Sequence, residues 1–218
     1  MSPRRRQALI LCLSVATILG SLLSILLPTR TTNALADSLH AAVGEHLALA
    51  TLDVTREAST IVLVTLEHGS NPTVDRHYQT FKETFLKSRP AHLLKEEFIN
   101  PEGSPKYGPG IGLSARKYQR LARRFPHASA IVSLIGLPDP EDLEPQPPGQ
   151  PAPAIVAYTR SPKRLASLFH QKRLLAAVAP RFLFPSPGPE IPSTRNEWFT
   201  NRFQTVFPDQ VAESQPAN

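Results

Sequence analysis

The chain has 218 residues, of which 24 are Lys or Arg, 18 are Asp or Glu and one is Cys. Four basic residues flank an N-terminal apolar run (Arg4, Arg5, Arg6 and Arg30), so the remaining 20 nearly balance the 18 acidic residues. This balance argues against nucleic acid as a partner. Cys12 is the only cysteine, which excludes intramolecular disulfides and a cysteine-ligated metal site.

The apolar run at residues 8–27 contains no charged residue. About 20 residues at ~1.5 Å per residue form a helix as long as the hydrocarbon core of a lipid bilayer is thick. Three arginines precede the run, which predicts an N-terminus in the cytoplasm and a following domain outside it, periplasmic or extracellular. Residues 1–36 are thus a basic tip plus a transmembrane anchor or, alternatively, a signal peptide cleaved after Ala36, which would release the domain.

Three further regions follow the N-terminal segment. Residues 37–58 carry apolar side chains every four residues, which predicts a stalk helix or a packing helix, although Gly44 within it is a poor helix former. Residues 59–184 are predicted to form an α/β domain. Residues 185–218 read as a proline-rich linker, then an aromatic helix that begins at the capping box of Thr194 and Glu197, then a disordered tail.

The α/β prediction comes from alternating strand and helix patterns. Five apolar runs are expected to be strands, at residues 60–66, 93–99, 130–135, 154–158 and 174–179. The first run is continuously apolar, as in a parallel strand buried on both faces. It is followed by Asn71 and Pro72, a good helix cap and first helical residue, and then by an apolar stripe that includes Tyr78 and Phe81.

Lys95, Glu96 and Glu97 interrupt the second run, a polarity typical of an edge strand. Between the third and fourth runs a proline-rich stretch replaces the usual crossover helix. The pattern therefore predicts a single doubly wound parallel five-stranded sheet in the flavodoxin-like order 2-1-3-4-5.

In such sheets ligands bind beyond the carboxyl ends of the strands, where the strand order reverses. In the predicted order, that point lies between strands one and three, with strand four beside it. The candidate ligand-binding residues in the loops there are Glu67, His68, Ser70, Asn71, Gly136, Tyr158, Thr159, Arg160 and Ser161. The same residues also suit ordinary caps and turns.

No catalytic residue, metal site or cofactor is predicted. The seven histidines lack a close metal-ligand spacing, and no G-x-S-x-G nucleophile motif occurs. Glu67-His68 at a strand end is the one pair with catalytic character.

The segments TIVLVTLEHGSNPTVDRHYQTF and IVSLIGLP, placed behind an export leader, resemble one lobe of a type I periplasmic (solute-binding) protein. The resemblance covers roughly residues 59–180 and implies ligand contacts at residues 67–71, at Gly136 and at residues 158–161. Members of that family have two lobes and a hinge, whereas this chain has length for one lobe. The resemblance therefore implies a single-lobe binding module.

Three functional hypotheses follow from these patterns. The first is a membrane-tethered extracytoplasmic module that binds a polar small ligand without catalysis and contacts the lipid bilayer through residues 8–27. The second is an envelope structural or assembly protein that docks a protein partner through its proline-rich loops and the aromatic helix with Trp198 and Phe199. The third is a hydrolase or transferase that uses Glu67 and His68.

Overall fold

A computed structural model describes residues 36–55, 59–88, 92–100, 112–145, 152–181 and 194–212. The chain divides into two compact units, Met1–Ser38 and Leu39–Asn218. The described part of the first unit is the beginning of a helix over residues 36–54. The apolar run at residues 8–27 and the tail at residues 213–218 lie outside the described residues. Within the described ranges, no helix combines the length and apolarity needed to cross a membrane.

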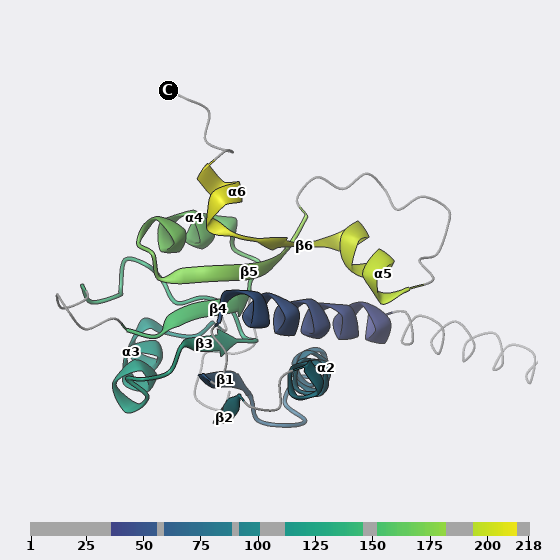
Figure 1. The fold of residues 1–218 in the computed structure, drawn as a ribbon, viewed down its shortest axis with the longest axis horizontal. Helices are drawn as coiled ribbons and strands as arrows, with labels where there is room; N and C mark the ends of the chain where they lie inside the picture. Colours follow the sequence, from purple (N-terminus) through teal and green to yellow (C-terminus); the bar gives the residue numbers. More distant parts are fainter. Residues whose placement is uncertain are drawn as a thin grey trace, which may run out of the picture. The chain divides into compact units, whose positions relative to one another are not determined.

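One sheet of six strands organises the described residues of the second unit (Figure 1). The strands are β1 (Thr60–Leu66), β2 (Leu93–Ile99), β3 (Ala130–Ser133), β4 (Ala154–Tyr158), β5 (Leu174–Pro180) and β6 (Phe203–Val206). Their order is β2-β1-β3-β4-β5-β6. The first five strands are parallel, and β6 pairs antiparallel with β5. The predicted order of the first five strands and the edge position of β2 are confirmed.

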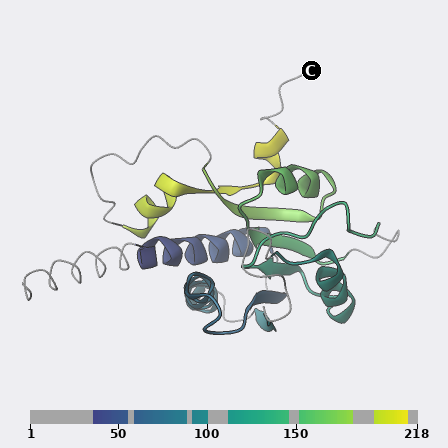
Figure 2. The same ribbon diagram turned by 180° about the vertical axis from the view of Figure 1, so that it is seen from behind.

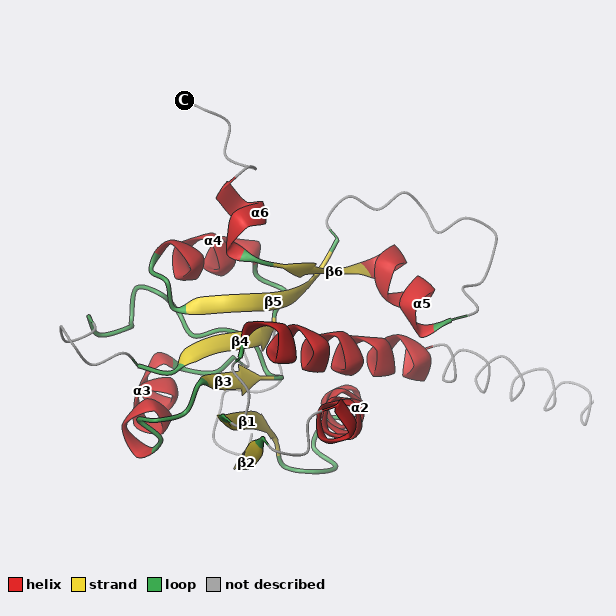
Figure 3. Cartoon of the chain, viewed as in Figure 1, coloured by secondary structure: helices red, strands yellow, loops and turns green. Residues whose placement is uncertain are grey.

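Helices cover both faces of the sheet, as Figures 1 and 2 show from opposite sides. The helix of residues 36–54, α2 (Pro72–Ser88) and α5 (Arg195–Arg202) pack on one face, and α3 (Ala115–Arg124) and α4 (Pro162–His170) pack on the other. The short α6 (Pro208–Ala212) lies against α4 and β5. Between β3 and β4, the described residues 134–145 and 152–153 form turns and loop, in place of a crossover helix (Figure 3).

The alternation of side chains along β1 divides the core into two clusters. Ile61 and Leu63 point toward the face covered by α2, and Val62, Val64 and Leu66 point toward α3 and α4. All five are almost completely buried. This two-sided burial explains why the run is continuously apolar rather than alternating.

The prediction for the C-terminal region was incomplete. Thr194 caps α5 as expected, because its hydroxyl accepts a hydrogen bond from the Glu197 amide. The helix ends at Arg202, however, and Phe203 begins a sixth strand that the sequence analysis did not anticipate. Phe203 and Val206, at opposite ends of β6, are both buried against the sheet. The burial of these two side chains stabilises the extended conformation there.

Gly44 lies where the helix of residues 36–54 crosses α2. A Cβ atom at position 44 would lie 2.4 Å from the backbone carbonyl oxygen of His77. The side-chain hydrogen of glycine therefore allows the two helix backbones to approach more closely than any other residue would.

Candidate functional site

The predicted ligand-binding residues lie at the carboxyl ends of β1, β3 and β4. On the side of the sheet that α2 covers, they fall into two groups, which the first turns of α2 separate. Asp75 and Tyr78 face the group that follows β1, whereas Thr73 and His77 lie on the opposite side of the same helix and face the group at β4.

The first group centres on His68. Its Nδ1 lies 3.3 Å from Oδ1 of Asp75, and its ring packs edge-on against Tyr78 and beside Phe98. The second carboxylate oxygen of Asp75 accepts a hydrogen bond from the Gly69 amide, which fixes the turn, and Gly69 has the positive φ of 81° that favours glycine. His68 therefore pairs with Asp75 and not with its neighbour Glu67.

Two other members of this group serve the local backbone. The Ser70 amide donates a hydrogen bond to the carbonyl oxygen of Glu67 and closes the turn. Asn71 is the cap of α2, because its Oδ1 accepts hydrogen bonds from the amides of Thr73 at 3.0 Å and Val74 at 3.3 Å. Its amide oxygen is thus already occupied.

Replacing Asn71 by alanine should therefore lower the free energy of unfolding by about 1 kcal/mol, the usual effect of losing a helix N-cap. Urea unfolding of the full-length chain measures this change, and Asn71→Asp, which keeps an accepting oxygen, should stay close to the parent. Equal destabilisation by both substitutions would contradict the capping role.

The second group lies at the end of β4. Arg160 is exposed, and its Nε donates a 2.9 Å hydrogen bond to the hydroxyl of Tyr158. The Tyr158 ring packs edge-on against His77 with ring centroids 4.9 Å apart, and His77 packs in the same way against His40 at 5.3 Å. Nε2 of His40 in turn lies 3.4 Å from the hydroxyl oxygen of Thr73. One polar and aromatic network thus joins β4, α2 and the helix of residues 36–54.

His77 is the buried centre of this network. Its side chain is fully buried, and neither ring nitrogen has a hydrogen-bond partner among the described residues. Burial, reinforced by the nearby His40 and Arg160, lowers the pKa of His77 to about 3. The imidazole of His77 is therefore neutral at physiological pH, whereas the guanidinium of Arg160 is positively charged.

Three further candidates shape the loops. Thr159 is buried, its amide bonds the carbonyl oxygen of Val178, and its hydroxyl accepts from the amide of Ser161 at 3.1 Å. Ser161 occupies the cap position of α4, but its side chain makes no capping bond. Gly136 has a φ of 108° in the turn after β3, and its carbonyl accepts a 2.6 Å bond from the Ser133 hydroxyl.

The residues that connect these groups carry no signal that was used to predict the site. His40 and His77 are 37 positions apart and carry no recognisable motif, so only the packing of the two helices brings them together. Asp75 carried a usable signal, because an acidic residue in the first turn of a helix can accept bonds from the preceding loop.

The assembly hypothesis placed a docking surface near Trp198 and Phe199 of α5, and in the structure Phe199 is buried and Trp198 is partly buried. Phe199 is 4% exposed and stacks on the His46 ring with centroids 3.6 Å apart, and Trp198 packs against the same core. Arg195 also reaches Glu45 at 3.3 Å. Helix α5 therefore packs on the domain through Phe199 and Trp198.

No protein-family model and no curated protein matches the sequence. Solved structures do match. The arabinose-binding protein AraP from Geobacillus stearothermophilus has a TM-score of 0.51 at 12% identity, with 83% of this chain covered. A sugar-binding protein of a sugar ABC transporter from Bacillus halodurans has a TM-score of 0.52 at 15% identity, with 81% covered.

The chain has a type I periplasmic binding-like fold. A putative LacI transcriptional regulator from Bacteroides fragilis shares this fold, with a TM-score of 0.51 at 9% identity over 81% of this chain. The chain covers 63%, 64% and 62% of the lengths of these three proteins, in the order given. The periplasmic binding-like fold agrees with the resemblance identified from the sequence.

Proposed function

We propose that this chain is a non-catalytic binding module for a small polar ligand, which contacts residues 158–161 at the carboxyl edge of the sheet. The module would lie outside the cytoplasm, tethered to the bilayer through residues 8–27 or released by cleavage after Ala36. The sugar-binding function of two structural neighbours supports this class of ligand.

The observation that carries the proposal is the setting of Arg160. Its Nε is held by the Tyr158 hydroxyl, while the rest of the guanidinium has no partner among the described residues. A guanidinium held at one nitrogen keeps its remaining N–H donors directed outward in a fixed fork. Such a fork suits the closely spaced oxygens of a sugar, a carboxylate or a phosphate.

Thermal unfolding of the full-length chain, screened against monosaccharides, amino acids and nucleotides, tests the proposal. Because the full-length chain includes the apolar run at residues 8–27, it is kept in detergent. That detergent should have no sugar headgroup, because a glycoside detergent would compete with monosaccharides for the site. A ligand present at about 100 times its dissociation constant should stabilise the protein by about 2.7 kcal/mol. Arg160→Ala should lower the affinity for that ligand tenfold or more, since charge-assisted hydrogen bonds contribute roughly 1.5–3 kcal/mol.

Arg120→Ala is the matched control, because Arg120 is an exposed arginine on α3, across the sheet from α2. It should leave the affinity unchanged. A screen without any stabilising compound, or a ligand bound equally well by Arg160→Ala, would contradict the proposed site.

A further inference from the structure

The two edges of the sheet differ in chemistry. The edge strand β2 carries Lys95, Glu96 and Glu97, the kind of charged side chains that discourage pairing with another chain. The opposite edge strand, β6, has the sequence FQTV and carries no charge. An uncharged edge rich in residues of high β-propensity is a template for a further strand.

The register of β6 shows which backbone groups face outward. The Arg181 amide donates a hydrogen bond to the carbonyl oxygen of Arg202. In an antiparallel ladder every second pair is hydrogen-bonded, so Ala179–Gln204 and Ala177–Val206 are the next hydrogen-bonded pairs between β5 and β6. Phe203 and Thr205 fall between these pairs, and their backbone groups point away from β5. The amide of Phe203 bonds to the carbonyl oxygen of Phe199. The Phe203 carbonyl and both backbone groups of Thr205 have no partner among the described residues.

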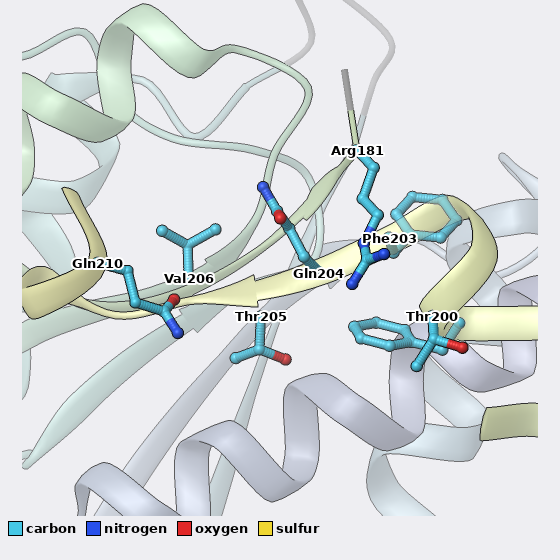
Figure 4. A pocket seen from close by; sticks show the side chains of 8 residues that line it. Arg181, Thr200, Phe203, Gln204, Thr205, Val206 and Gln210 are labelled. Atoms are coloured by element: carbon cyan, nitrogen blue, oxygen red, sulfur yellow. The ribbon is translucent and has the colours of Figure 1, made fainter. Parts of the chain in front are cut away.

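A hollow of about 500 Å³ lies along this strand (Figure 4). It is lined by Arg181, Phe199, Thr200, Phe203, Gln204, Thr205, Val206 and Gln210. Gln204 and Val206 stand on one side of β6 and Thr205 on the other. At the far end, Oε1 of Gln210 accepts from the Phe207 amide and ends the row of outward-facing backbone groups.

The charge of this lining indicates a partner with a negatively charged group. Arg181 is exposed and makes no ion pair within the described residues, and the lining contains no acidic side chain. A negatively charged group near the Phe203 end of β6 would thus meet a guanidinium without competition from a carboxylate of the described lining. Arginine binds carboxylates through paired hydrogen bonds.

We propose that β6 binds an extended peptide segment of a partner protein as a seventh strand, with a carboxylate of that segment on Arg181. Backbone hydrogen bonds to Phe203 and Thr205 supply the affinity, and the hollow accepts alternate side chains of the peptide. Arg160 does not line this hollow, although the ring of Tyr158, which holds Arg160, has its centroid 6.1 Å from that of the Phe203 ring.

The test uses fluorescence polarisation with a fluorescein-labelled peptide, KTVTVT, carrying a free C-terminal carboxylate, and the full-length protein. Binding with a dissociation constant below about 1 mM is expected. Amidating the peptide C-terminus, or substituting Arg181→Ala in the protein, should each weaken binding at least tenfold. The control Arg120→Ala should bind like the parent.

Backbone N-methylation of the peptide identifies strand pairing without altering the protein. In a paired strand, alternate peptide amides point toward β6 and away from it. Methylation of the amides that point toward β6 should abolish binding, and methylation of the amides that point away should leave binding intact. Absence of binding by the parent peptide, or equal effects of the two methylated sets, would overturn the proposal. Arg160→Ala should not change peptide binding, which keeps this result independent of the small-ligand site.

Discussion

Replacing Gly44 by alanine is expected to destabilise the protein by about 3 kcal/mol, the upper part of the usual range for overpacking a core. Propensity alone predicts the opposite sign, because alanine favours a helix over glycine by about 1 kcal/mol. The new Cβ would lie 2.4 Å from the His77 carbonyl oxygen and 3.1 Å from its Cα, and both are backbone atoms that cannot rotate away. The helix of residues 36–54 would have to separate from α2.

Urea unfolding of the full-length chain measures this change through the fluorescence of Trp198, the only tryptophan, which packs against the core. Asp53→Ala is the matched control, since Asp53 is exposed on the same helix. Its effect should stay within about 0.5 kcal/mol. A Gly44→Ala protein that is more stable than the parent would show that the two helices do not approach this closely.

The second large effect is loss of stability in acid, caused by His77. Its pKa is about 3 in the folded chain, against 6.5 for the ordinary side chain. Between these values the unfolded state binds a proton that the folded state does not, so stability falls as pH falls from about 6.5 toward 3. The contribution of His77 to this loss is about 3 kcal/mol at pH 4.5.

His77→Phe isolates this contribution. A phenyl ring keeps the edge-on packing with Tyr158 and His40, and it sacrifices no hydrogen bond, because neither His77 nitrogen has a partner among the described residues. Stability at pH 7.5 should therefore be retained, and the decline between pH 7.5 and pH 4.5 should be shallower by the amount given above. Parallel pH profiles for the two proteins would contradict the assignment to His77.

His46 acts in the same direction, because burial lowers its pKa more than Glu45 and Asn196 raise it. Carboxylates contribute equally to the parent and the variant. The difference between the two pH profiles therefore reports His77 alone.

The sequence predicted the parallel part of the sheet well because each strand carried a local signal. The continuous run of β1 indicated burial on both faces, and the charges of β2 indicated an edge. Strand β6 gave no such signal, since four residues directly after a helix do not establish a period of two. Its conformation depends on pairing with β5, which is tertiary information.

The positions of the candidate site residues were predictable, but their contacts were not. The position of Arg160 and Asn71 at strand ends follows from topology, so sequence could indicate it. The partners of these residues depend on helix packing. The sequence indicated Gly44 only as a poor helix former, whereas in the structure it allows close approach of the two helices that carry His40 and His77.

The contacts between α5 and the helix of residues 36–54 affect the order of folding. Glu45 and Arg195 meet across 150 positions of sequence, and Phe199 stacks on His46. Contacts between residues so distant in sequence form slowly and late, because a long loop must close first. During synthesis the first helix of the domain emerges long before its aromatic neighbour. The domain therefore completes its core only after α5 and β6 have been made.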